Sequence, residues 1–281
     1  MAKSKQNKNK KKSTQNENKL IYIPFAVLIV VIVLLVVFPY INHNPSTGTI
    51  TANANTPLFN VYKVSNTNYV GNNSVEIYFI SWYGCPNGAT ASWPLYLALR
   101  HFGNVSVVPH YSIYESDLGS AIPGLLFLNY TPYPTSHVYF HPIYIYGQYL
   151  NETTNGTPIN TDDVTFGLQE LKSMVPNWVY NLVVYYEVNQ TYTQIGTSPA
   201  YYGKYPHIIT IIIISGPGGT WVDLGYPNSI SPQTLAGLNS TVLYNAILKN
   251  NPALSGQYAS AYENITNATN ILLNTIVKAS S

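Results

Sequence analysis

The only cysteine of the chain, Cys85, stands in the stretch "FISWYGCPNGATASW", residues 79 to 93. It follows an apolar run and precedes a helix-like run, so unpaired N–H groups at the helix N-terminus would stabilise a thiolate. Pro86 suits the first helical position, which needs no N–H group. A dithiol centre needs a second cysteine where Gly88 stands, and without it the intramolecular step that releases a mixed disulfide is lost.

Three roles for Cys85 therefore stay open. A single thiol can exchange with external disulfides or be oxidised to sulfenic acid. It can also bind a metal or another ligand with the help of other residues. A free cysteine can finally be a small buried apolar side chain, which is a common fate of this residue type. No Lys, Arg or His lies close in sequence, so the helix dipole acts alone unless His207 is brought near.

Other combinations of reactive residues are weaker. His137 and His141 lie in a strand-like segment, where their side chains would share one face about 13 Å apart, too far to share a metal. We therefore expect no metal and no cofactor. Asp162 and Asp163 suit the start of a helix better than acid–base catalysis. The run "YYGKYPH" can present an aromatic platform to extracellular sugar or protein partners.

The N-terminus predicts a membrane anchor. Residues 1–19 hold seven of the 13 basic residues, and residues 20–41 carry no charge over a length that can span a bilayer. The lysines would stay cytoplasmic, which places the C-terminal body outside the cell. A cleaved signal peptide is the alternative, but its apolar region is normally shorter. A lysine tail beside an anchor is a topology signal, so no nucleic-acid partner is expected. Residues 42–58 resemble a polar linker.

The body of the chain suits an extracellular surface. Nine Asn-x-Ser/Thr sequons, all beyond the anchor, predict a glycoprotein. Charged residues make up only 9% of the chain and tyrosines number 26. Few carboxylates titrate on such a surface, so we expect tolerance of an acidic medium. The sequons begin at Asn72, Asn104, Asn129, Asn151, Asn155, Asn189, Asn239, Asn264 and Asn267.

Periodicity predicts one α/β domain with a mixed sheet flanked by helices over residues 59–281. An insertion over about 124–190 should hold a Tyr-rich hairpin or extension and then helices, with 177–188 either helix or strand. An extra C-terminal helix is expected at about 259–277. The other strands are predicted at 74–81, 105–114, 206–215 and 220–226, and the other helices from 86 to a stop at 103, at 161–175 and at 231–250.

The turn "SWYGCPNGA", with Trp82, Cys85 and Pro86, resembles the active-site turn of thioredoxin-like proteins of the disulfide-bond-forming type, which carry Cys-Pro-x-Cys. That resemblance implies that Cys85 is the nucleophile and that Pro206, in "KYPHIITIIII", is the cis-proline. The chain departs from this motif at Gly88, which stands where the second cysteine of Cys-Pro-x-Cys would be. Nearly the whole ectodomain also resembles crenarchaeal membrane-anchored proteins classed as domain-of-unknown-function family 929, regarded as thioredoxin-like. This second resemblance implies the fold and assigns no activity.

Two functions follow from this reading. A degenerate, non-redox site makes the chain a binding or scaffold module at the cell surface, which favours a protein that is not an enzyme. The alternative is thiol–disulfide exchange or a folding factor that works through Cys85 alone.

Overall fold

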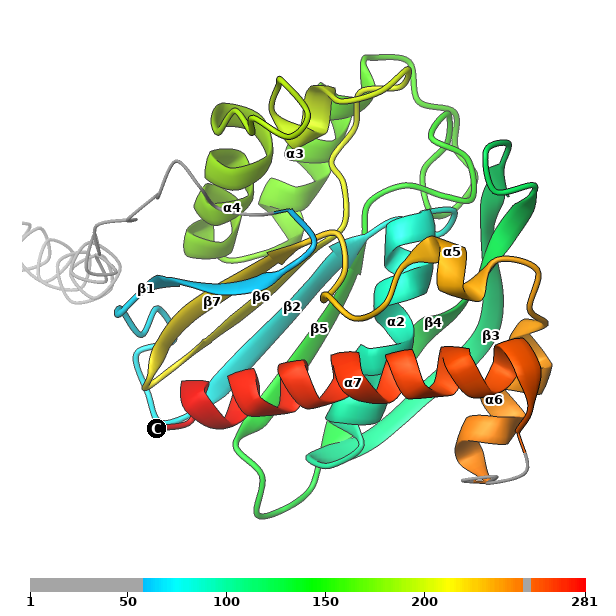
Figure 1. Cartoon of the computed structure of the whole chain (residues 1–281). Helices are drawn as coiled ribbons and strands as arrows, with labels where there is room; N and C mark the ends of the chain where they lie inside the picture. The colour runs from blue at the N-terminus through cyan, green and yellow to red at the C-terminus, as the bar shows by residue number, and fades with distance from the viewer. Residues whose placement is uncertain (1–57, 250–253) are drawn as a thin grey trace, which may run out of the picture. The chain divides into compact units, whose positions relative to one another are not determined.

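The computed structural model describes residues 58–249 and 254–281 (Figure 1). The described residues form a mixed α/β domain whose main sheet has the strand order β1-β7-β6-β2-β5. β2 is parallel to β5, and the other neighbours are antiparallel. The five strands are β1 (Val61–Ser65), β2 (Val75–Ser81), β5 (Val138–Tyr144), β6 (Ile211–Gly216) and β7 (Gly219–Leu224).

The centre of the sheet is apolar on both faces. In β6, Ile211 and Ile213 belong to one core, and Ile212 and Ile214 belong to the other. This alternation follows from the two-residue period of a strand, and an unbroken run of isoleucines fills both sides. The prediction of a doubly buried strand here is confirmed, although the strand begins at Ile211 and residues 206–210 lead into it.

Helices cover both faces. One face packs against α2 (Pro86–Leu99), α5 (Pro232–Leu235), α6 (Ser240–Leu248), α7 (Gly256–Ala279) and a two-stranded ribbon of β3 (Gly103–Glu115) and β4 (Ser120–Pro132). Figure 1 shows α2 and α7 on the near side of the sheet. The other face packs against α3 (Asp163–Met174), α4 (Asn177–Val183) and the π-helical turn η1 (Val184–Asn189).

The C-terminal helix α7 completes the larger core. Ile265, Ala268, Leu272 and Ile276 recur at helical spacing and are all fully buried, as the sequence predicted. The helix ends against the β6–β7 turn, where Gly218 N donates to Ala279 O at 3.0 Å. A Cβ at Gly218 would lie 1.9 Å from Lys278 O, so this close approach requires glycine.

The structure differs from the sequence expectation at residues 124–150. Strand β5 lies within the expected insertion, yet it pairs with β2 over all seven residues as part of the main sheet. The second strand that the sequence predicted, 105–114, lies outside the main sheet: it forms β3 and pairs with β4. The inserted element is therefore the β3–β4 ribbon. Pro142 is tolerated in β5 because this strand forms the edge of the sheet.

Two helical predictions also need adjustment. Residues 177–188 form α4 and then η1, which resolves the choice between helix and strand in favour of helix. The helix expected over 231–250 is divided into α5 and α6. Gly237, at a φ of 79°, breaks it, and Asn239 caps α6 by accepting a bond from Val242 N.

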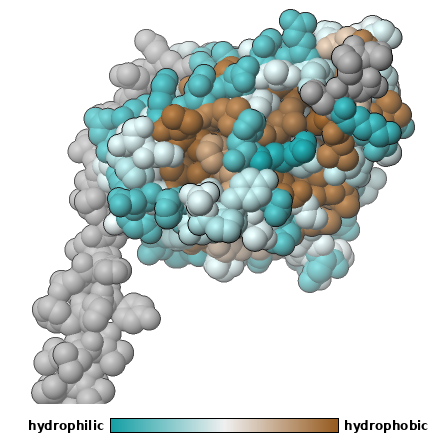
Figure 2. All heavy atoms as spheres, turned by 90° about the horizontal axis from the view of Figure 1, so that it is seen from below, coloured by the Kyte–Doolittle hydropathy of each residue, from teal (hydrophilic) through white to brown (hydrophobic). Residues whose placement is uncertain are grey.

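The expected lysine tail, anchor and nearly all of the linker fall within residues 1–57 and so lie outside the described residues. Within the described part, no helix is long and apolar enough to span a bilayer. Seen from below, the domain carries apolar residues bordered by hydrophilic ones (Figure 2).

Strand β7 carries a carboxyl group into the interior. Asp223 is 1% exposed between its strand neighbours Val61 and Ile212, and neither of its carboxyl oxygens has a hydrogen-bond partner among the described residues. Burial disfavours the charged form and raises the pKa of Asp223 to about 8. The side chain is thus protonated in the folded protein at neutral pH.

This carboxyl predicts a pH-dependent stability. The folded state holds a proton that the unfolded chain has lost, so the free energy of unfolding should fall as pH rises from about 4 to about 8. Between about pH 5 and pH 7 the carboxyl is ionised in the unfolded chain and protonated in the folded protein, so the loss should approach about 1.4 kcal/mol per pH unit for this group. Asp223→Asn should flatten the profile of urea midpoint against pH, whereas the exposed control Glu263→Gln should not. An unchanged slope in Asp223→Asn would contradict the assignment.

Candidate functional site

Cys85 lies at the junction of β2 and α2, where the sequence predicted it. Strand β2 ends at Ser81, and α2 begins at Pro86, with Cys85 in the N-cap position and in extended conformation. Its side chain makes no cap hydrogen bond to the helix backbone. The thiol is therefore held at the positive end of the helix without serving as a cap.

The thiol is enclosed by hydroxyl groups. Cys85 is 3% exposed, and its Sγ lies 3.0 Å from Thr210 Oγ1, which in turn lies 2.9 Å from Ser81 Oγ. Burial raises the pKa of Cys85, and the Thr210 hydroxyl and the N–H groups of Gly88 and Asn87 only partly oppose this rise. No cation is among the groups that act on the thiol. Cys85 is thus held as the neutral thiol.

Gly88 has no space for a side chain. A Cβ at this position would lie 2.1 Å from Ser81 Oγ and 3.1 Å from Thr210 Oγ1. The pair of hydroxyls occupies the volume into which a resolving cysteine would project. A second sulfur here requires that this pair move apart, so the departure from Cys-Pro-x-Cys is built into the packing.

The turn before Cys85 is closed from above by two segments. In the β3–β4 ribbon, Ile113 N donates to Gly84 O at 2.9 Å, and His110 Nε2 lies 2.8 Å from Tyr83 O. The loop after β5 covers Gly84 so closely that a Cβ there would lie 2.0 Å from Gln148 O. Access to the thiol therefore requires that the ribbon or this loop move.

Trp82 packs against the loop that precedes β6. Its ring is 3% exposed and meets His207 edge to face at 5.5 Å between ring centroids. The His207 ring also lies against Tyr146, and burial lowers the pKa of His207. The histidine that sequence suggested as a thiol activator is thus a neutral packing partner of Trp82.

Pro206 is exposed, and its peptide bond is trans, as are all peptide bonds among the described residues. The residue against the thiol is Thr210, directly before β6. The implied role of Pro206 as a cis-proline beside Cys85 therefore does not hold in this structure. The available signal for the missed pair was one Ser or Thr in each apolar run, Ser81 in "IYFIS" and Thr210 in "IITIIII".

A second buried carboxyl lies next to this site. Glu187, in the π-helical turn η1, is fully buried, and its Oε2 accepts a bond from Ile209 N at 2.7 Å. Its Oε1 has no partner among the described residues. Burial raises the pKa of Glu187 well above its ordinary value. The neutral Glu187 carboxyl thus holds Ile209 in place, and Ile209 directly precedes Thr210, whose hydroxyl contacts the Cys85 thiol.

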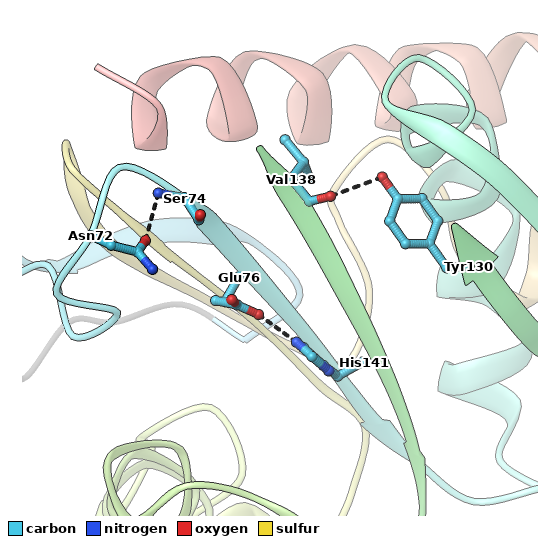
Figure 3. A network of polar contacts seen from close by, with 6 residues as sticks. All are labelled: Asn72, Ser74, Glu76, Tyr130, Val138 and His141. Carbon is cyan, nitrogen blue, oxygen red and sulfur yellow. Dashed lines mark hydrogen bonds and ion pairs between the residues drawn. The ribbon is translucent and has the colours of Figure 1, made fainter. Parts of the chain in front are cut away.

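The histidines of the β-like segment do not form a metal site. The Nε2 atom of His141 on β5 is hydrogen-bonded to the Glu76 carboxylate on β2 (Figure 3). The His141 ring also stacks on Tyr78 at 4.5 Å between ring centroids. His137 lies at the start of β5 and is exposed. The described residues contain no group of three His, Cys, Asp or Glu side chains placed to hold a metal.

All nine sequon asparagines lie among the described residues, and eight of them are exposed. Asn264 on α7 is half-buried. At Asn72 the side-chain oxygen accepts a bond from Ser74 N at 2.7 Å, so this contact uses the oxygen and not the nitrogen that would carry a glycan (Figure 3). The sequons are thus accessible, with Asn264 the least so.

The comparison with protein families decides the relationship of the chain. A family model described as "Domain of unknown function (DUF929)" matches residues 60–278, nearly the whole described domain. The chain belongs to the DUF929 family. Its matched range includes Cys85, Gly88, Thr210 and α7 through Lys278, but not the predicted anchor. Comparison with curated proteins and with solved structures gives no match.

The packing at Gly88 predicts an unusual mutational sign. At an open helix position, Gly→Ala stabilises by about 0.5–1 kcal/mol. Here Gly88→Ala should instead destabilise by about 1–3 kcal/mol, because Ser81 and Thr210 must shift. Adding Ser81→Ala removes the closest atom and should recover part of the loss, as measured by urea unfolding. If Gly88→Ala instead stabilised the protein, the Ser81 and Thr210 hydroxyls would have to move apart at little cost, and the prediction would be wrong.

Proposed function

We propose that this chain is a membrane-anchored extracellular protein with a thioredoxin-like domain that serves as a binding or scaffold module and not as a redox enzyme. Three features support the thioredoxin-like part. The parallel pair β2 and β5 is connected through α2, β6 and β7 form an antiparallel pair followed by helices, and Cys85 stands where the first helix begins.

The enclosed thiol carries the non-redox part of the proposal. Thiol–disulfide exchange needs a thiolate and an open path to the attacked sulfur. Cys85 has a raised pKa and is 3% exposed, and the β3–β4 ribbon and the loop after β5 cover the turn that holds it. Gly88 removes the resolving thiol, and its surroundings exclude a replacement. Such a site keeps the fold of the β2–α2 turn but does not support thiol–disulfide exchange.

One feature favours the alternative, thiol exchange or a folding factor acting through Cys85 alone. The backbone N–H groups of Asn87 and Gly88, at the start of α2, act to lower the pKa of the thiol and would stabilise a thiolate once water or a partner reaches it. This alternative requires opening of the β3–β4 ribbon or of the loop at Gln148. The closed arrangement favours the binding module.

The proposed location rests on the N-terminal sequence and on the sequons. The uncharged run 20–41, preceded by seven lysines, supports an anchor with the N-terminus in the cytoplasm. Exposed sequon asparagines are compatible with glycosylation of an extracellular surface. Partners would then be extracellular proteins or glycans.

Thiol labelling tests the non-redox proposal directly, because Cys85 is the only cysteine. Iodoacetamide should label the native full chain at least about 100-fold more slowly than the chain in denaturant, since the neutral thiol is enclosed. Mass spectrometry follows the reaction. Cys85→Ser provides the blank for labelling and should show the same, negligible insulin reduction as the native protein. Rapid native labelling together with activity lost in Cys85→Ser would establish the alternative.

Membrane fractionation tests the anchor separately. Alkaline carbonate should leave the full chain in the membrane pellet, because a spanning apolar helix is not released by loss of charge contacts. Glycosidase added to intact cells should lower its apparent mass if the sequons face outward and carry glycans. Recovery of the chain in the carbonate supernatant would overturn the anchor, whatever the state of Cys85.

A further inference from the structure

The loop between β5 and α3 covers the turn before Cys85, and its two ends are fixed. At its start Tyr146 is fully buried, and its backbone oxygen accepts a bond from Tyr83 N at 3.3 Å. The Tyr146 hydroxyl donates to Asp163 O at 2.6 Å, which joins the start of the loop to the start of α3. A surface loop whose ends are held together in this way is an Ω-loop. We call residues 147–161 the cover loop, which Figure 1 shows in green beside the tip of the β3–β4 ribbon.

The cover loop is held together mainly by its own bonds. Gly147 N donates to Glu152 O and Ile159 N donates to Asn151 O, both at 2.9 Å. A further β-bridge pairs Glu152 with Pro158. These bonds do not depend on the rest of the domain, so the cover loop can move as one compact unit.

The hydrogen bonds from the cover loop to other described parts of the domain all come from the side chain of Gln148. Its Nε2 donates to Tyr111 O on the ribbon at 3.2 Å, and Gln148 is also a hydrogen-bond partner of the His110 ring. Beyond its first residue the loop has no buried side chain, although Leu150 and Ile159 are half-buried against the core. Segments with few buried apolar contacts and exposed bonds open locally at a low free-energy cost.

The β3–β4 ribbon, which also covers this turn, is anchored more firmly. Trp93 Nε1 on α2 donates to Pro123 O at 2.8 Å, and Ser240 Oγ on α6 donates to Gly124 O at 2.9 Å, both away from solvent. A Cβ at Gly124 would lie 2.5 Å from Ala89 Cα, so the ribbon lies in close contact with α2. Movement of the ribbon would leave these buried groups without partners, which costs more than the loss of one exposed bond.

We propose that the cover loop is a lid that opens as one unit, while the ribbon stays in place, and that this opening admits reagents to Cys85. The lid pivots on its fixed ends at Tyr146 and Asp163, and the Gln148 side chain is its latch. This inference goes beyond the proposed function. A lid can protect a thiol that has no reaction of its own, and it is also the element that thiol exchange would need to open.

Labelling of Cys85, the only cysteine, reports on this opening. The slow reaction of the native full chain with iodoacetamide should stay nearly constant in urea well below the unfolding midpoint, because lid opening exposes little surface. Labelling that required global unfolding would instead accelerate with urea in proportion to the unfolding equilibrium. That dependence would overturn the lid.

A pair of glutamine variants tests the latch. Gln148→Ala should speed native labelling about threefold to tenfold, the effect of one lost hydrogen bond. Gln257→Ala is the matched control, because Gln257 Nε2 also donates to a backbone oxygen of a distant segment, Ala236 O at 2.8 Å, but forms no bond to the cover loop. It should change the rate less than about twofold, and urea unfolding checks that both variants keep the native midpoint. An unchanged rate in Gln148→Ala, or equal acceleration in Gln257→Ala, would contradict the proposal.

Amide hydrogen exchange identifies the part that moves. Ile113 N–H on the ribbon is bonded to Gly84 O at 2.9 Å, so its protection reports on the ribbon. If the lid alone opens, the Ile113 amide should exchange at the same rate in Gln148→Ala and in the native protein. Faster exchange there, in step with faster labelling, would show that the ribbon moves and would refute the inference. The difference in labelling between native and denatured chain would be unaffected, so the non-redox proposal and the lid fail separately.

Discussion

The hydrogen bond between Ser81 and Thr210 is the contact around which the candidate site is arranged. It joins the last residue of β2 to the residue before β6, directly beneath the start of α2. The Cys85 thiol is the third member of this group, because it contacts the Thr210 hydroxyl. Above the group there is no space for a side chain at position 88, which glycine satisfies. The β2–α2 turn and the residue before β6, more than a hundred positions apart in sequence, meet in this one polar group. The surrounding core is apolar, so each hydroxyl must find its partner within the group.

The same constraint explains why an enclosed cysteine can occupy a position suited to reaction. A helix N-terminus lowers the pKa of a thiol only where solvent can support the thiolate, and desolvation opposes that effect. At Cys85 desolvation is the larger influence. The covering segments lie outside the parallel and antiparallel core pairs of the sheet. They enclose the thiol without taking part in the pairing of those strands.

Sequence predicted those parts of the fold that depend on local pattern. The isoleucine run of β6, the buried stripe of α7 and the turn at Cys85 are all written in consecutive residues. Strand pairing was harder to predict. The segments of β3 and β5 both resemble strands, and only the tertiary structure decides that β5 joins β2. Thr210 was missed for the same reason, because its partners lie more than a hundred residues away. Asp223 gives no local signal of burial, since an acid inside an apolar strand resembles an exposed position.

The docking of α7 has a consequence for the time at which the domain can fold. Its buried stripe closes the larger core over β6, β2 and α2, and its last turn bonds to the glycine-rich turn after β6. The face it covers stays open until residues near position 279 have left the ribosome. Domains otherwise tend to fold from the N-terminus as synthesis proceeds. In this chain the larger core therefore cannot be completed until the last helix has emerged, whereas the core on the other face of the sheet contains no residue of that helix.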